Sequence, residues 1–190
     1  MRQIRLLLTL ALGCACAAGV AAEPQSTLDS NTAFYEGESL NYVVYPPEGY
    51  RMVDWEATAD GYSFAFIPKA QTYDEADLMI GVNIFKIRGL AFDEVITNDT
   101  VAVREHYGDN VSIWPVDSIF AASGQTIPTF FVNDPSRFLP NVMISYVNGG
   151  TELLVFELVI TDRVARVKAG DAFIECLEKL KVLPVGELGY

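Results

Sequence analysis

The sequence predicts an α+β protein in which two helices pack against one mostly antiparallel sheet. Three observations indicate this architecture. Short segments of alternating apolar character follow one another with turn signals between them, which is typical of antiparallel hairpins. Helical periodicity occurs once in mid-chain and once near the end. One central segment is apolar on both faces, so a covering layer is expected on each side of the sheet.

The predicted centre of the sheet begins with an aromatic strand. Tyr62, Phe64 and Phe66 alternate with small or branched residues, which predicts a strand that Pro68 brings to an end. A second strand is predicted over residues 78–87, where both alternating sets of side chains are mostly apolar. Such a strand is expected in the middle of a sheet that is covered on both faces.

The other elements follow from periodicity and turn signals. Further strands are predicted at residues 40–45, 51–58, 111–120, 125–132, 142–147 and 151–160. The Asp-Gly pair at 60–61 is expected to join the second of these to the aromatic strand, and the Asn-Gly-Gly run at 148–150 to join the last two. Helices are predicted over 92–107 and 161–180, because apolar residues recur there at helical spacing.

The beginning of the chain predicts a bacterial signal peptide at residues 1–22. Arg2 and Arg5 stand before a run of apolar and small residues, and small residues precede a cleavage site after Ala22. The expected divisions are the signal peptide at 1–22, a flexible lead at 23–38, one α+β domain at 39–184 and a C-terminal tail at 185–190. The expected location is therefore the periplasm or the outside of the cell.

A lipoprotein signal is the alternative interpretation of the same segment. Gly13 directly precedes Cys14, as in a lipobox, although the residues before them are in a less typical order. In that case Cys14 would carry a lipid anchor. No later stretch is long and apolar enough to predict a transmembrane span.

The composition argues against several classes of partner and cofactor. The chain has 13 Lys and Arg residues against 25 Asp and Glu residues, a formal net charge of −12. No basic face is visible for nucleic acid, and anionic lipid headgroups would be repelled. Cys14 and Cys16 lie in the predicted signal, so a mature chain would keep Cys176 alone and form no internal disulfide. No cluster of Cys and His has metal-ligand spacing, so neither a metal nor a cofactor is expected.

Three segments together resemble the PsbP/Mog1-like superfamily. Residues 45–50, YPPEGY, resemble the P-x-G-W/Y opening of that family; residues 64–69, FAFIPK, with the strand at 77–85 resemble its centre; and residues 171–177, DAFIECL, resemble its closing helix. The resemblance implies an α/β/α sandwich around an antiparallel sheet. Many members are small exported bacterial proteins, and the best-known branches bind other proteins, as photosystem subunits or as partners of a small GTPase. The family pattern contains no catalytic motif to transfer to this chain.

Two residues are candidates for catalytic chemistry, and for both the structural interpretation is favoured. His106 is the only histidine, and a histidine base is normally accompanied by a nucleophile and an orienting partner. It stands where the predicted helix ends, a position that favours an imidazolium through the helix dipole. Cys176 lies on the apolar stripe of the last helix, where a free cysteine behaves as a small hydrophobic residue.

Aromatic residues are the candidates for a contact site. Trp55, Tyr62, Tyr73 and Trp114 fall on or beside predicted strands. One interpretation is a concave aromatic patch that binds a peptide, a glycan or a small ligand. The other is packing in the core, because aromatic side chains supply large buried areas.

Three functions remain open at this point. The leading hypothesis is an exported protein that is not an enzyme and acts by contact with another protein or component of the cell envelope. The first alternative is a periplasmic carrier that holds a small ligand on an aromatic sheet face. The second alternative is an unrecognised hydrolase that uses His106.

Overall fold

A seven-stranded antiparallel sheet forms the centre of the protein. The computed structural model describes residues 31–87, 89–108, 110–133, 142–160 and 166–185. The strand order is β3-β4-β5-β11-β10-β9-β6, and all neighbours pair antiparallel. The strands are β3 (Tyr50–Val53), β4 (Phe64–Pro68), β5 (Leu78–Lys86), β6 (Ser112–Pro115), β9 (Thr129–Asn133), β10 (Val142–Asn148) and β11 (Glu152–Ile160).

Smaller elements surround this sheet. A three-stranded sheet is formed by β1 (Ala33–Glu36), β2 (Leu40–Val44) and β12 (Lys181–Pro184), and a two-stranded sheet by β7 (Ile119–Phe120) and β8 (Thr126–Ile127). The helical elements are α2 (Trp55–Ala59), the short 3₁₀ helix η1 (Tyr73–Glu75), α3 (Phe92–Tyr107) and α4 (Arg166–Glu178). Among the described residues, no helix is long and apolar enough to cross a membrane.

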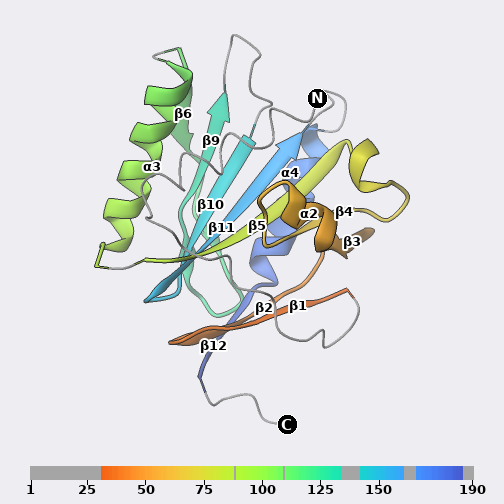
Figure 1. Cartoon of the computed structure of the whole chain (residues 1–190), viewed down its shortest axis with the longest axis horizontal. Helices are drawn as coiled ribbons and strands as arrows, with labels where there is room; N and C mark the ends of the chain where they lie inside the picture. The colour runs from red at the N-terminus through yellow and green to blue at the C-terminus, as the bar shows by residue number, and fades with distance from the viewer. Residues whose placement is uncertain (1–30, 88, 109, 134–141, 161–165, 186–190) are drawn as a thin grey trace.

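The main sheet has a layer on each face (Figure 1). Side chains of β11 alternate between the two faces. Leu154, Phe156 and Leu158 belong to the core beneath α4, which also includes the three-stranded sheet. Leu153 and Val155 point the other way and pack with α3, while α2 covers a smaller cluster on that same face. The α+β sandwich expected from the sequence is therefore confirmed.

The strongest sequence patterns correspond closely to observed elements. The helix predicted over 92–107 has the same limits as α3, and the central strand predicted over 78–87 corresponds to β5. The hairpin at 148–150 joins β10 to β11. The apolar stripe predicted for the last helix is buried, and Cys176 lies in it with no exposed surface.

The strand predicted over residues 51–58 is wrong beyond Val53. The chain turns into the one-and-a-half-turn helix α2, in which the backbone N–H and the hydroxyl of Thr58 both donate to the carbonyl of Asp54, at 2.8 and 2.9 Å. This turn places Ala57 in the apolar cluster of Tyr62 and Val53, where it is fully buried. Burial of Ala57 thus overrides a short alternating pattern that fits a helix or a strand.

Other differences also arise where contacts distant in sequence decide the structure. Part of the predicted lead, residues 33–36, forms strand β1 and pairs with β2. The end of the chain adds β12 to the other side of β2, immediately after the last helix. The strand predicted over 125–132 is divided into β8 and β9 at Pro128, which has no N–H to continue a ladder. The strand predicted over 111–120 likewise forms β6 and β7.

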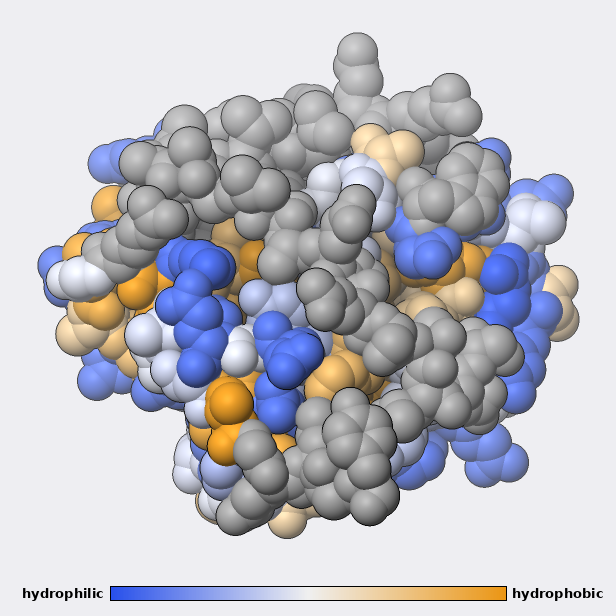
Figure 2. Space-filling model, turned by 60° about the horizontal axis from the view of Figure 1, so that its bottom comes forward, coloured by the Kyte–Doolittle hydropathy of each residue, from blue (hydrophilic) through white to orange (hydrophobic). Residues whose placement is uncertain are grey.

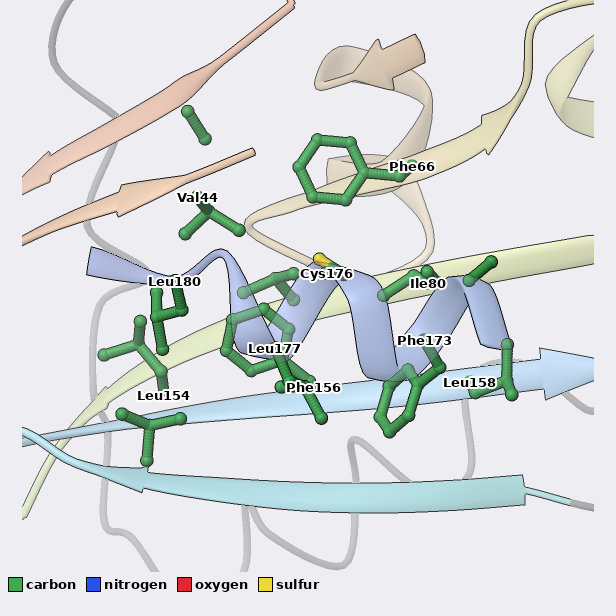
Figure 3. Packing of buried hydrophobic residues seen from close by; sticks show 14 of the residues in the cluster. Val44, Phe66, Ile80, Leu154, Phe156, Leu158, Phe173, Cys176, Leu177 and Leu180 are labelled. Carbon is green, nitrogen blue, oxygen red and sulfur yellow. The ribbon is translucent and has the colours of Figure 1, made fainter. Parts of the chain in front are cut away.

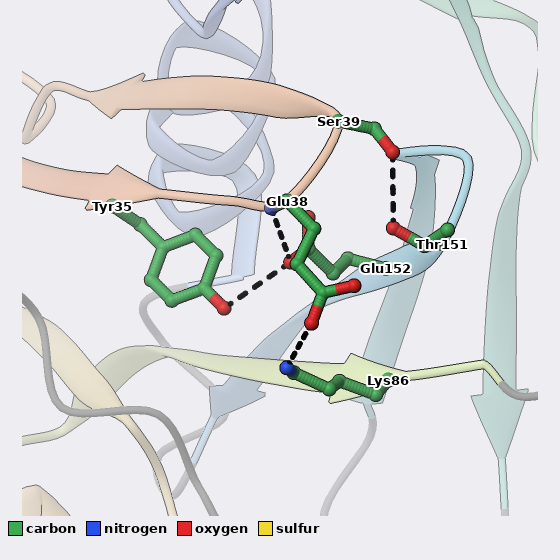
Figure 4. A network of polar contacts seen from close by, with 6 residues as sticks. All are labelled: Tyr35, Glu38, Ser39, Lys86, Thr151 and Glu152. Carbon is green, nitrogen blue, oxygen red and sulfur yellow. Dashed lines mark hydrogen bonds and ion pairs between the residues drawn. The ribbon is translucent and has the colours of Figure 1, made fainter. Parts of the chain in front are cut away.

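Glu152 attaches the turn between β1 and β2 to the hairpin of the main sheet (Figure 4). Its Oε1 accepts a hydrogen bond of 2.9 Å from the backbone N–H of Glu38 and a longer one of 3.5 Å from the hydroxyl of Tyr35. The Glu152 side chain is buried, and burial beside this carboxyl raises the pKa of Tyr35 to about 12. Outside this buried contact, Lys86 forms an exposed ion pair with Glu38.

Replacing Glu152 with alanine is expected to lower the free energy of unfolding by about 1–3 kcal/mol, because it removes the buried oxygen that accepts hydrogen bonds from the Glu38 N–H and the Tyr35 hydroxyl. Lys86→Ala removes an exposed ion pair from the same network and is expected to cost about 0–1 kcal/mol. Urea unfolding of both variants measures the difference. Equal losses would mean that the buried carboxyl does not hold the small sheet in place.

Candidate functional site

Two of the residues predicted for a contact site lie in the interior. Tyr62 and Tyr73 are 2% and 7% exposed and share the apolar cluster beneath α2. The hydroxyl of Tyr73 donates to Asp60 at 3.0 Å, and that of Tyr62 donates to Glu157 at 2.9 Å. Their rings therefore contribute packing and internal hydrogen bonds rather than an accessible surface.

Among the predicted contact residues whose side chains the structure describes, Trp114 is exposed. It lies on β6, an outer strand of the main sheet, and 45% of its surface is accessible. Its ring meets the ring of Phe131 on β9 edge to face, with centroids 5.5 Å apart and planes at 83°. Phe131 is opposite Met143 on β10, and both are half-buried. We call Trp114, Phe131 and Met143 the Trp114 patch.

The Trp114 patch lies on the face of the sheet that carries α4. Met143 packs against the core of that face. The residue before Trp114 on β6 is Ile113, and the residue before Phe131 on β9 is Phe130. Both of these pack on the opposite face, toward α3. The helix α4 packs against β11 and β7. Trp114 thus lies on an outer strand of the main sheet and is open to solvent. Tyr62 lies near the other end of the strand order, just before β4.

The remaining candidates are placed only in part. Trp55 begins α2 and His106 lies in the last turn of α3, but their side chains are outside the described part of the structure, as is Cys14. Cys176 donates a weak hydrogen bond of 3.5 Å to the carbonyl of Tyr45, and burial raises the pKa of its thiol. A buried thiol of raised pKa is unsuited to nucleophilic attack.

Sequence reasoning missed a pair of buried acids, Asp99 and Glu157. Glu157 lies on β11, on the face of the sheet toward α2 and α3. Its carboxyl group accepts a hydrogen bond from the hydroxyl of Tyr62. Its partner across the ladder is Gly81, and a Cβ on Gly81 would lie 2.3 Å from the Tyr62 ring. The absence of a side chain at Gly81 therefore leaves room for the Tyr62 ring, whose hydroxyl reaches Glu157.

Asp99 approaches the same region from α3. The hydroxyl of Tyr146 on β10 donates to its Oδ2. Burial raises the pKa of Asp99 to about 6, against the opposing effect of the Tyr146 hydrogen bond. Burial also raises the pKa of Glu157 to about 7; the hydrogen bond from Tyr62 lowers it, and the charge of Asp99 raises it further. A signal was present in the sequence, since Glu157 is an acid in the middle of β11, where its neighbours from Leu153 to Ile160 are all apolar.

A shallow groove of about 550 Å³ lies elsewhere, beside the three-stranded sheet and the end of α4. Tyr45, Ala122 and Lys181 are among its lining residues, and the ammonium of Lys181 stands 5.3 Å from the centre of the Tyr45 ring. Figure 2 turns the side of the small sheet toward the viewer, and among its coloured residues polar and apolar ones are mixed. The groove contains none of the predicted contact residues.

The described side chains provide no evident metal centre. No group of three or more His, Cys, Asp or Glu residues among them is arranged to hold a metal ion. Tyr62, Tyr73 and Trp114 do not form the single aromatic face that the sequence suggested, since the two tyrosines are internal. Among the described side chains, the arrangement provides the exposed Trp114 patch and the buried pair of Asp99 and Glu157, while Phe120 on β7 is a further exposed aromatic residue.

Comparison with known proteins places the fold. No protein-family model and no curated protein matches the chain. LpqN of Mycobacterium tuberculosis, described as involved in cell envelope biogenesis, is similar in structure, with a TM-score of 0.53 and 11% identity over 85% of this chain and 90% of LpqN. The cyanobacterial PsbP of Synechocystis has a TM-score of 0.49 and 13% identity over 85% of this chain and 98% of its own. A mutant of Mog1 has a TM-score of 0.45 and 12% identity over 82% and 97%.

The chain has the layered α+β fold that the sequence predicted, and this fold is similar to that of LpqN. At these identities the likeness concerns the arrangement of helices and strands. It assigns no site, because the functions hosted by one fold depend on its individual side chains.

Proposed function

We propose that this protein is exported and acts without catalysis, by contact of the Trp114 patch with another protein of the cell envelope. The observation that carries the proposal is an exposed tryptophan on a strand of the main sheet, in edge-to-face contact with the ring of Phe131. Tryptophan is among the residues that contribute most to binding at protein interfaces, because it brings a large apolar area at low entropic cost.

The mode of contact follows from the chemistry of β6. An outer strand can bind a partner through its free backbone groups or through its side chains. Pro115 ends β6 and has no N–H to donate, which disfavours the addition of another strand there. We therefore place the contact on the side chains of the Trp114 patch, with Trp114 as its anchor.

Export rests on the signal predicted at residues 1–22, and the alternative of a lipid on Cys14 keeps the protein in the same compartment. The similarity to LpqN, a protein described as involved in cell envelope biogenesis, supports the same setting. The intact mass of the protein purified from its host distinguishes the two forms. A chain beginning at Glu23 indicates cleavage after Ala22, and a lipid-modified chain beginning at Cys14 indicates the anchor.

Trp114→Ala is expected to weaken partner binding at least about 30-fold, as for the loss of an interface anchor. A photo-crosslinking residue in place of the exposed Ser112, two residues before Trp114 on β6, keeps the anchor intact. In the full chain, expressed in the native host, it should form a discrete adduct whose partner is identified by peptide mass spectrometry. The affinity of that purified partner for the wild type and for Trp114→Ala is then measured by calorimetry.

The matched control is Val101 on α3, which is also 45% exposed. A crosslinker at 101 should not give the same adduct, and Val101→Ala should bind as the wild type does. Adducts of equal yield from both positions, or unchanged binding by Trp114→Ala, would contradict the proposed surface. Turnover on a hydrolase panel that disappears in His106→Ala would contradict the non-catalytic assignment.

A further inference from the structure

Among the described side chains of α3, one charge-bearing residue is buried toward the sheet. Val95, Ile96 and Val103 form its buried stripe, and Asp99 lies among them with 2% of its surface exposed. An acid at such a position would normally be expected on the solvent face of an amphipathic helix. Asp99 instead binds the hydroxyl of Tyr146 on the sheet beneath it.

Glu157 lies close to Asp99 on the neighbouring strand. Tyr146 on β10 pairs with Val155 on β11, and Glu157 follows Val155 by two residues, so its side chain points to the same face. Glu157 is 1% exposed, and the charge of Asp99 is near enough to affect its ionisation. Two carboxyl groups are therefore enclosed together between a helix and a sheet.

No cation faces this pair among the described residues. The groups that face it are the hydroxyls of Tyr62 and Tyr146 and the amide of Asn83 on β5, besides the two acids themselves. No Lys or Arg is among the buried residues of the described chain, and none contributes to the ionisation of either acid. Two buried negative charges would repel each other here without compensation.

Unpaired polar atoms are consistent with a bound proton at this place. Within the described part of the chain, Oδ1 of Asp99, Oε1 of Glu157 and Nδ2 of Asn83 have no hydrogen-bond partner. A protonated carboxyl group becomes a donor and loses its charge, and both changes lower the cost of burial. The geometry thus favours a state in which at least one of the acids carries a proton.

We propose that Asp99 and Glu157 form a proton-operated latch, which holds α3 on the sheet while a proton is bound and loosens the helix when both acids are ionised. The latch is independent of the Trp114 patch. Its effect reaches α3 because Asp99 belongs to that helix, whereas Glu157 belongs to the central strand β11.

The direction of the pH dependence follows from the raised pKa values. When α3 is detached, the acids are in water with their ordinary values of 3.8 and 4.5, whereas the packed state has pKa values of about 6 for Asp99 and about 7 for Glu157. The packed state binds the proton more tightly than the detached state does. Proton binding therefore stabilises the packed state fully when the pH is below the ordinary pKa values of 3.8 and 4.5. This stabilisation of the packed state is lost as the pH rises through the pKa values of the packed state, about 6 and about 7. Above these values, the titration of the two acids no longer changes the stability of the packed state.

The test is hydrogen exchange of the α3 backbone amides in the full chain, corrected for the intrinsic rate at each pH. From about pH 5 to about pH 8, the equilibrium constant for opening of α3 is expected to rise several hundredfold, as the product of about tenfold from Asp99 and about seventyfold from Glu157. Glu157→Gln keeps an acceptor for the Tyr62 hydroxyl but cannot ionise. In this variant the rise of the opening constant of α3 over the same pH range should be at least about fivefold smaller than in the wild type. Glu105→Gln alters an exposed acid of the same helix and should behave as the wild type does.

A second measurement needs no variant. Carboxyl carbon NMR of the wild type should show Glu157 titrating well above an exposed glutamate. Protection of α3 that does not change with pH, or a pH dependence that is the same in Glu157→Gln and the wild type, would overturn the proposal. So would a Glu157 carboxyl that titrates at its ordinary value.

Discussion

Gly81→Ala is expected to lower the free energy of unfolding by about 2–4 kcal/mol, a large effect for one methyl group. A Cβ at this position would lie 2.3 Å from Cε1 and 2.5 Å from Cδ1 of Tyr62. The Tyr62 ring is buried among Met79, Ala65 and their neighbours and has little room to move. Displacing it would also break its hydrogen bond to Glu157 and leave a buried acid without that donor.

Gly170→Ala is the matched control, because it adds the same methyl group where no atom lies within 4 Å of the new Cβ. Gly170 is inside α4, so alanine should stabilise the helix by about 0.5–1 kcal/mol. Urea unfolding at one fixed pH gives both values, and the two substitutions should change stability in opposite directions. A Gly81→Ala protein as stable as the wild type would show that Tyr62 does not rest on Gly81.

The fold could be predicted from the sequence because its main elements are long and periodic. The helix α3 and the strand β5 each repeat their pattern over several turns or pleats, and the Asn-Gly-Gly run before Thr151 determines a hairpin by local backbone geometry. Patterns of this length depend on neighbouring residues. They therefore remain visible without knowledge of the tertiary contacts.

Short elements could not be predicted, since partners far away in the chain determine them. Strand β1 has four residues and gains its structure by pairing with β2 and by the contact of Tyr35 and the nearby turn with Glu152. The five-residue helix α2 has too few residues for its periodicity to be distinguished from that of a strand. Its burial against the cluster of Tyr62 is a tertiary property.

The candidate site shows the same limit. The sequence suggested Tyr62 and Trp114 for one kind of role, and only their places in the fold separate an internal ring from an exposed one. The acid pair was harder to find, because Tyr62 and Glu157 are 95 residues apart, and Tyr146 and Asp99 are 47 apart. An acid within a doubly covered strand is the signal that could have directed attention to Glu157.

Phe173→Ala is expected to destabilise the protein by about 3–5 kcal/mol, because it opens a cavity between α4 and the sheet. Phe173 has no exposed surface, and Figure 3 shows its ring pointing from α4 toward the sheet, between Phe156 and Leu158. Phe156 and Leu158 both lie on β11, the strand in the middle of the main sheet. The surrounding side chains therefore cannot collapse into the cavity without moving the sheet. Thermal or urea unfolding measures the loss.

Ile174→Ala tests the next residue of the same helix, which is only half-buried against the core. Its loss is expected to be about 1–2 kcal/mol, because solvent already reaches part of the side chain and little cavity remains. The comparison therefore separates burial from helix propensity, since both variants place alanine at neighbouring positions of α4. Equal losses for the two variants would mean that α4 does not hold this face of the sheet through Phe173, and the layered arrangement on that side would need revision.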